Sequence, residues 1–155
     1  MSWFPALRYT LFGIFLGAEW AKKKLRIHDL RAMCARLGLS YLGDKKLPEA
    51  LSLYGTPFAR IDALIISNLI DGEHNGTRII AFDCQFNDGS NQCWRTLIAA
   101  RTADDVFSSA TREGALTSAR SSAWQILYRP HETSDDALGT MPLSEIEAII
   151  TGVNR

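Results

Sequence analysis

Three apolar runs separated by two glycine turns constrain the fold of this chain more than any other feature of its sequence. The runs cover residues 61–70, 78–86 and 93–100. The dipeptides Asn75-Gly76 and Asp88-Gly89 separate them, and both tolerate the positive φ angles that tight hairpin turns require. The sequence therefore predicts a three-stranded antiparallel meander over residues 61–100.

A hairpin turn also determines which residues face each other across two strands. With Asn75-Gly76 as the turn, Asn68 is expected opposite Asp83, and Leu69 opposite Phe82. One face of the sheet then collects Ile61, Ile65, Leu69, Ile80, Phe82 and Phe86, and the other collects Leu64, Ile66, Ile70, Ile79 and Ala81. Because both faces are apolar, we expect helices to cover the sheet on each side.

Asp83 has two interpretations at such a half-buried position. As a functional group it is an acid or a base. As a structural group it bonds neighbouring backbone or Asn68, because a buried carboxylate is costly unless it is hydrogen-bonded. The sequence places no second carboxylate or histidine beside Asp83, and this favours the structural interpretation.

The chain has three cysteines, Cys34, Cys84 and Cys93, and their spacing matches no zinc pattern. If Asp88-Gly89 forms a two-residue turn, Cys84 lies opposite Cys93 at a site where side chains approach closely. A disulfide between Cys84 and Cys93 is then geometrically possible. Two reduced thiols are the alternative, which a cytoplasmic location favours.

The rest of the chain is expected to add helices and strands around the meander. Residues 26–37 place Ile27, Leu30, Cys34 and Leu37 on one helical face and stop at Gly38, a residue suited to a left-handed cap. We also expect a short strand at 39–42, a short helix at 49–54, a long loop at 102–122, a strand at 123–128 and a helix at 142–152. The predicted fold is α+β, with an antiparallel sheet of four to five strands in a single domain over residues 26–155.

An apolar and basic segment, residues 1–25, precedes this domain and is expected to be helical. Its uninterrupted apolar core covers residues 9–18, whereas a membrane-crossing helix needs about 20 apolar residues. Aromatic residues border the core and lysines follow it, as in an interfacial anchor with a positive-inside signal. The residues expected to form the anchor are Trp3, Phe12, Phe15, Trp20, Lys22, Lys23 and Lys24. The alternatives are a cleaved signal peptide, a surface helix and a helix packed within protein.

As an anchor, residues 3–20 attach the domain to a membrane or to a larger assembly. The following lysines place the domain on the cytoplasmic face of the inner membrane, and a cytoplasmic location is the alternative. The formal net charge of the chain is zero, and no basic stripe runs along it. Because phosphate contacts need many Lys and Arg residues, we predict no nucleic-acid partner.

The chain lacks the sequence motifs that identify a reaction. It contains no phosphate-binding loop, no dinucleotide fingerprint, no nucleophile elbow and no zinc-protease pair. His28 and His74 are expected to face solvent, and no cofactor or metal site is predicted. The remaining catalytic candidates are Asp83 and His131, with Cys84 and His131 as the one thiol–imidazole pair to test.

A spacing of glycine and aromatic residues in the meander resembles a group of bacterial proteins of unknown activity. Its residues are Asn68, Gly72, Gly76, Phe82, Asp83, Phe86, Asp88 and Gly89. The similarity extends over most of residues 30–132 and includes Gly38-Leu39, Thr96 and Arg129-Pro130-His131. Cys84 stands where an aromatic residue is usual, His131 interrupts an Arg-Pro-Glu step, and the C-terminal part is shorter. The resemblance implies an α+β domain, often with an N-terminal hydrophobic segment, and transfers no catalytic residue.

These features predict a non-enzymatic binding or scaffolding domain that its N-terminal segment attaches to a membrane or a larger assembly. The rival hypothesis is a small enzyme or ligand-binding domain. Its pocket is expected between the sheet and the 102–122 loop, with Asp83, His131 or Tyr128 as the working residues.

Overall fold

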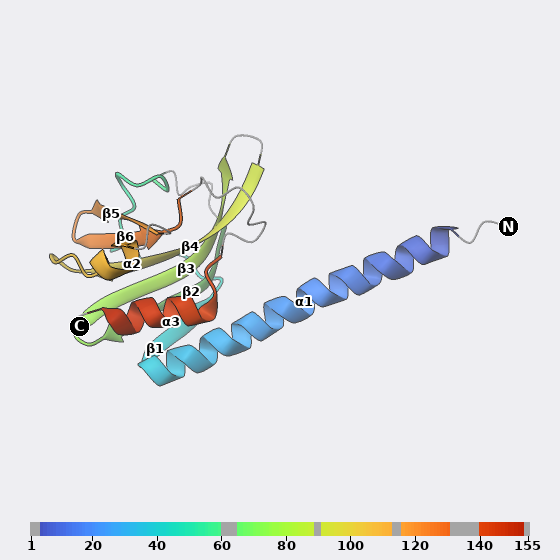
Figure 1. Cartoon of the computed structure of the whole chain (residues 1–155), viewed down its shortest axis with the longest axis horizontal. Coiled ribbons are helices and arrows are strands. Elements are labelled where there is room, and N and C mark those ends of the chain that lie inside the picture. Colours follow the sequence, from blue (N-terminus) through green and yellow to red (C-terminus); the bar gives the residue numbers. More distant parts are fainter. Residues whose placement is uncertain (1–3, 60–64, 89–90, 113–115, 131–139, 154–155) are drawn as a thin grey trace.

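The computed structural model describes residues 4–59, 65–88, 91–112, 116–130 and 140–153, and the side chains among them from residue 17 onward except those of 86–88 and 91–93. These residues form an α+β fold with three helices and six strands (Figure 1). The helices are α1 (Phe4–Leu37), α2 (Ser108–Arg112) and α3 (Leu143–Gly152). The strands are β1 (Leu39–Gly43), β2 (Ile65–His74), β3 (Thr77–Asp88), β4 (Asn91–Arg101), β5 (Thr117–Ser121) and β6 (Trp124–Tyr128). They form one antiparallel sheet in the order β1-β2-β3-β4-β6-β5. The predicted α+β fold with an antiparallel sheet is therefore confirmed, but the sheet has six strands instead of four to five.

The hairpin between β2 and β3 has the predicted turn. Asn75 and Gly76 have φ angles of 51° and 78°, the left-handed conformations of a type I′ turn. Glu73 pairs with Arg78 on either side of it, in the predicted register. The start of the meander is thus confirmed from Ile65 onward, whereas residues 61–64 lie outside the described part of the chain.

A β-bulge between Ser67 and Ile70 shifts the register of β2 against β3 by one residue. Ser67, rather than Asn68, is the backbone partner of Asp83. Asn68 lies in the bulge with a φ angle of 53°, in the left-handed region that Asn adopts more readily than most residues. The predicted pairing of Asn68 with Asp83 in the ladder is therefore wrong, because the turn fixes the register only as far as the first irregularity.

The same bulge changes which side chains share a face. Leu69 lies within the bulge, so its predicted backbone pairing with Phe82 is also wrong. Leu69 and Phe82 still belong to one buried cluster, and Ile66 packs against that cluster instead of lying on the opposite face. Because the bulge inserts one residue, the side chains of β2 that precede it point to the opposite face of the sheet from the one predicted.

The strands β3 and β4 are joined one residue later than predicted. Asp88 pairs with Asn91, so the connection consists of the two residues after Asp88. Cys84 consequently pairs with Arg95 and not with Cys93. Within the described side chains Cys84 is a free, buried thiol, and the facing position that suggested a disulfide with Cys93 is not formed.

Helices cover one face of the sheet. The C-terminal part of α1 and the whole of α3 pack side by side on it (Figure 1). The helices contribute Leu30, Met33, Cys34, Ile146, Ile149 and Ile150, and the strands contribute Ile70, Ile79, Ala81, Ile98, Ala100 and Leu127. The predicted helices at 26–37 and 142–152 and the strand at 123–128 are confirmed, and the first of these helices ends at Gly38 with a φ angle of 72°.

An irregular segment, residues 44–59, covers the other face. Leu51, Leu53 and Phe58 are buried against the sheet there, in the cluster that contains Phe82 and Trp124. The predicted helix at 49–54 is wrong, because this stretch consists of turns and extended backbone. Leu51 and Leu53 are both buried while Ser52 between them is not, an alternation typical of extended chain rather than helix.

The predicted loop at 102–122 contains two further elements, α2 and β5. Strand β5 pairs with β6 through a tight hairpin in which Ser121 faces Trp124, and Ser122 has a φ angle of 55°. Most of β5 is half-exposed at the edge of the sheet, and the strand contains no large apolar residue. An edge strand of this composition carries no alternating apolar pattern, which explains why the sequence predicts a loop.

Helix α1 is one continuous helix of 34 residues, and its N-terminal part extends away from the domain as a rod (Figure 1). Residues 17–25 are all exposed, whereas Leu30, Met33 and Cys34 are buried under the sheet. The predicted boundary near residue 25 is thus a change in packing and not a break in the helix. Among the described residues, no helix reaches the length and apolarity of a membrane span.

Candidate functional site

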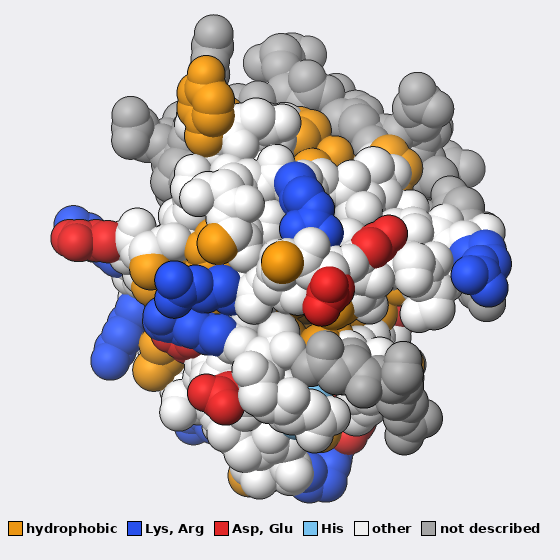
Figure 2. Space-filling model, turned by 90° about the vertical axis from the view of Figure 1, so that its left-hand side faces the viewer, with side chains coloured by type: hydrophobic (Ala, Val, Ile, Leu, Met, Phe, Trp, Pro, Cys, Tyr) orange, Lys and Arg blue, Asp and Glu red, His pale blue; other side chains and the backbone are white. Residues whose placement is uncertain are grey.

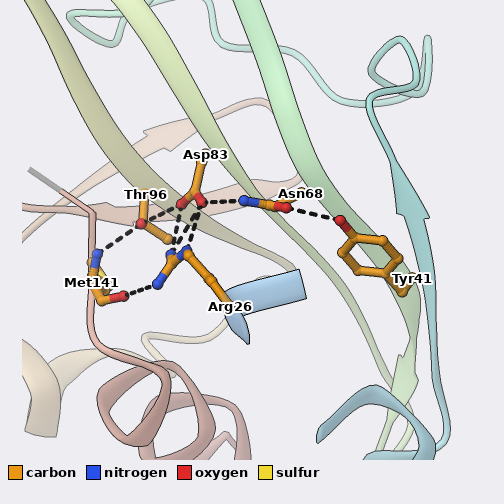
Figure 3. A network of polar contacts seen from close by, with 6 residues as sticks. All are labelled: Arg26, Tyr41, Asn68, Asp83, Thr96 and Met141. Atoms are coloured by element: carbon orange, nitrogen blue, oxygen red, sulfur yellow. Dashed lines mark hydrogen bonds and ion pairs between the residues drawn. The ribbon is translucent and has the colours of Figure 1, made fainter. Parts of the chain in front are cut away.

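The candidate site is a network of polar contacts around Asp83, where α1 meets the sheet (Figure 3). Asp83 lies on β3 beneath α1, and only 3% of the residue is exposed. Arg26 of α1 donates to it, with Nη2 at 3.1 Å from both carboxylate oxygens and Nε at 3.2 Å from Oδ2. Forked contacts between a guanidinium and a carboxylate are stronger than hydrogen bonds between neutral groups.

Two neighbouring strands complete the coordination of the Asp83 carboxylate. Thr96 Oγ1 of β4 donates to Oδ1 at 2.6 Å, and Asn68 Nδ2 of β2 donates to Oδ2 at 2.8 Å. Asn68 makes this bond from within the bulge, so the predicted contact between Asn68 and Asp83 is confirmed even though their predicted ladder pairing is wrong. The bulge is thus the local feature that turns the amide towards the carboxylate.

An outer ring of bonds connects the network to the rest of the fold. Tyr41 of β1 donates its hydroxyl to Asn68 Oδ1 at 2.8 Å, which fixes the orientation of the amide. Met141, just before α3, donates its backbone N–H to Thr96 Oγ1 at 2.8 Å and accepts a bond from Arg26 Nη1 at 2.9 Å. One carboxylate therefore joins α1, the strands β1 to β4 and the start of α3.

The network leaves no room for a substrate. The cavity that Arg26, Asn68, Asp83 and Thr96 line has a volume of about 10 Å³, which is no more than one water molecule occupies. Both oxygens of Asp83 already accept hydrogen bonds from side chains of the protein itself. The geometry supports the structural interpretation of Asp83.

Besides Tyr41 and Met141, sequence reasoning missed Arg26, the cation of this site. It stands at the end of the basic run that starts at Lys22, and the whole run was interpreted as an anchoring charge cluster. The signal for its role is chemical: a buried carboxylate needs a cationic partner, and Arg forms forked contacts that Lys does not. Only 24% of the Arg26 side chain is exposed, whereas Lys22 remains 68% exposed.

The buried thiols are poor nucleophiles. Burial raises the pKa of Cys34 to about 11 and that of Cys84 to about 12, with Asp83 adding to the second shift. The thiolate is the reactive form, and at neutral pH it is almost absent from both residues. The predicted pairing of Cys84 with His131 has no structural test, because His131 lies outside the described residues.

The raised thiol pKa values lead to a prediction about alkylation. In the folded protein at pH 7.5, iodoacetamide is expected to modify Cys34 and Cys84 at least 100-fold more slowly than in guanidinium-unfolded protein, because thiolate is scarce and access is blocked. Mass mapping of the modified peptides over time measures the two rates separately. Equal rates of Cys84 alkylation before and after unfolding would contradict its burial.

The described histidines do not form a metal site. His28 is exposed on α1 as expected. His74 is half-buried, with Nδ1 3.3 Å from the carbonyl oxygen of Leu37, so the expectation that it faces solvent is wrong. His74, at the end of β2, thus contacts the last residue of α1, and the last carbonyls of a helix have no partner within it. No group of three or more His, Cys, Asp or Glu side chains capable of holding a metal ion occurs in the described part of the chain.

Two surface hollows near residues 102–122 are lined by neither Asp83 nor Tyr128, and His131 lies outside the described residues. One hollow of about 240 Å³ lies between the α2 region and α3 and is lined mainly by apolar groups. A wide, shallow one is lined by Arg101, Thr102, Ala103, Arg120, Ser122 and Ala123. The face in Figure 2 shows basic and acidic side chains scattered among uncharged ones. Tyr128 is buried on the opposite sheet face, in an edge contact with Phe58 at 5.1 Å.

The described anchor residues are exposed on α1. Trp20 is 61% exposed, and Lys24 Nζ lies 3.7 Å from the centre of its ring. Lys22 forms an exposed ion pair with Glu19 at 3.0 Å. The side chains of Trp3, Phe12 and Phe15 lie outside the described part.

Comparison with protein-family models, with curated proteins and with solved structures found no match to this chain.

Proposed function

We propose that this protein is a non-enzymatic binding or scaffolding domain that the N-terminal part of α1 attaches to a membrane. The observation that carries the proposal is the rod formed by α1, whose residues 17–25 are exposed without exception and include Trp20 and Leu25 at 61% and 63% exposure (Figure 1). A helix that leaves its own domain with large apolar residues exposed is typical of an interaction segment.

The sequence of the rod favours lipid over a protein groove. Between residues 9 and 18 every side of the helix is apolar or uncharged, and burying a helix in a groove requires only one apolar face. Residues 4–20 of α1 extend about 25 Å at 1.5 Å per residue, close to the 30 Å thickness of a hydrocarbon layer. The two charged residues in that stretch, Arg8 and Glu19, stand on either side of the uninterrupted apolar core 9–18, and a long Arg side chain can place its charge at the headgroups.

The lysines after the apolar stretch of α1 suggest on which side of the membrane the domain lies. Lys22, Lys23 and Lys24 follow the apolar stretch directly, and basic residues at this position favour the cytoplasmic side. We therefore place the domain on the cytoplasmic face of the inner membrane.

The surroundings of the described catalytic candidates disfavour the rival enzyme, whereas His131 lies outside the described residues. Asp83 is fully bonded in a closed network, Cys84 is a buried neutral thiol, and Tyr128 is packed in the core. Burial raises the pKa of Tyr128, so its hydroxyl stays neutral. A binding function is consistent with this arrangement because it does not require these side chains to react.

Replacing Phe15 with Asp tests the attachment. A carboxylate near the middle of the apolar stretch is unfavourable by roughly 3 kcal/mol, so the partition of Phe15→Asp into lipid vesicles is expected to fall by about 100-fold. The measurement is flotation of the full chain with vesicles over a range of lipid concentrations.

The matched control is Tyr54→Asp, which places the same charge at an aromatic residue on the domain that is 85% exposed. It should float as the unmodified chain does. Equal loss of flotation in both variants, or no flotation of the unmodified chain, would overturn the proposal; in the second case a lipid-free assembly detected by light scattering would assign the segment to protein contacts.

A further inference from the structure

The charged residues just after the apolar stretch of α1 form a compact group of exposed lysines. Lys22, Lys23 and Lys24 are consecutive, and successive helical residues point about 100° apart, so the three ammonium groups surround more than half of the helix. We propose that this lysine collar binds the anionic headgroups of phospholipids and makes the attachment selective for negatively charged membranes. The inference rests on the membrane attachment proposed above.

The contacts of the neighbouring charges leave the collar as a distinct basic group. Arg26, the next cation along the helix, is bonded to Asp83 and turned towards the sheet. Glu19 pairs with Lys22 and offsets one of the three charges in an exposed contact that water and salt weaken. The collar therefore retains about two net positive charges at its end of the rod.

The position of Lys24 relates the collar to a membrane interface. Its ammonium group lies over the ring of Trp20, one helical turn closer to the apolar stretch. Trp is enriched at the headgroup level of bilayers, and lysines beside it reach the phosphate layer. A Trp–Lys pair at the border of an apolar stretch is thus placed where lipid phosphates lie.

The charge of the domain makes the collar the main source of attraction. Residues 26–155 contain 13 Lys and Arg residues against 16 Asp and Glu residues, a formal charge of −3. An anionic membrane repels a domain of this sign, and charges more than about 10 Å from the surface are screened at physiological salt. Selective binding to anionic lipid must therefore arise at the collar.

The test compares vesicles of phosphatidylcholine alone with vesicles that contain 30% phosphatidylglycerol, using the full chain with Lys22→Gln, Lys23→Gln and Lys24→Gln combined. Each lysine near an anionic surface contributes about fivefold in affinity, so the triple variant is expected to lose roughly 30- to 100-fold in partition into the anionic vesicles. Its partition into neutral vesicles is expected to stay within twofold of the unmodified chain. Raising the salt from 0.1 to 0.5 M should remove most of the difference between the two vesicle types.

The control combines Lys45→Gln, Lys46→Gln and Arg112→Gln, which removes three charges from exposed residues of the domain. It should retain the selectivity for anionic vesicles. Equal binding of the unmodified chain to both vesicle types, or an equal loss in both triple variants, overturns the collar while leaving the membrane attachment intact. If the unmodified chain binds neither the neutral nor the anionic vesicles, both proposals are overturned.

Discussion

Replacing Asp83 with Ala is expected to destabilise the protein by about 3–5 kcal/mol, the range measured when one partner of a buried ion pair is removed. Arg26 of α1 then remains against the sheet without its carboxylate, while Thr96 and Asn68 lose a hydrogen-bond acceptor at buried positions. Because the network joins α1 to the sheet, the loss should also loosen the docking of this helix. Urea unfolding of the full chain in mild detergent, followed by far-UV circular dichroism, measures the change.

Asp71→Ala is the matched control. Asp71 accepts two bonds from Arg78, at 2.9 and 3.1 Å, so the geometry resembles that of Asp83 with Arg26. The Asp71 pair is solvent-accessible, with 37% of the Arg78 side chain exposed, and such pairs contribute no more than about 1 kcal/mol. A loss of stability at Asp83 no larger than that at Asp71 would contradict the buried network.

Replacing Trp124 with Ala is expected to lower the free energy of unfolding by about 3–5 kcal/mol. Trp124 is 2% exposed, and its indole N–H donates to the carbonyl oxygen of Ala50 at 2.8 Å. The side chain therefore both fills the second apolar cluster and holds the irregular segment 44–59 on the sheet. Trp124→Phe retains most of the volume and loses only the hydrogen bond, so a loss of about 1–2 kcal/mol is expected.

The control for this change is Trp20→Ala on the exposed rod, for which stability should stay within about 0.5 kcal/mol. Hydrogen exchange should also show faster opening of residues 44–59 in Trp124→Ala and unchanged exchange there in Trp20→Ala. Protection of residues 44–59 that is unaffected by Trp124→Ala would show that other contacts hold this segment.

The sequence predicts the parts of this fold that depend on local geometry. Asn75-Gly76 specifies a turn with two positive φ angles, and Gly38 specifies the end of a helix, so both positions are correct. The bulge at Asn68 has no such local signal, and this is why the predicted pairings of Asn68 with Asp83 and of Leu69 with Phe82 are wrong. Strand β5 was missed for a related reason, because its polar composition follows from its place at an edge that only the folded sheet defines.

The candidate site shows the same division between local and distant contacts. The need of Asp83 for a hydrogen-bonding partner follows from its place in an apolar strand, and Asn68 was identified as that partner. Arg26 lies 57 residues earlier in the chain, so its contact with Asp83 depends on how α1 packs against β3. No spacing in the sequence encodes that distance, and the basic run around Arg26 suggested a surface role for all of its members.

Fractionation of cells that produce the full chain tests the attachment of the domain most directly. The membrane pellet is washed with high salt, then with alkaline carbonate, and finally with detergent, and the protein is followed at each step. The proposed attachment by residues 4–20 predicts that the protein stays in the pellet through the salt wash and is released completely by detergent. A monodisperse monomer in the detergent-free soluble fraction would contradict it.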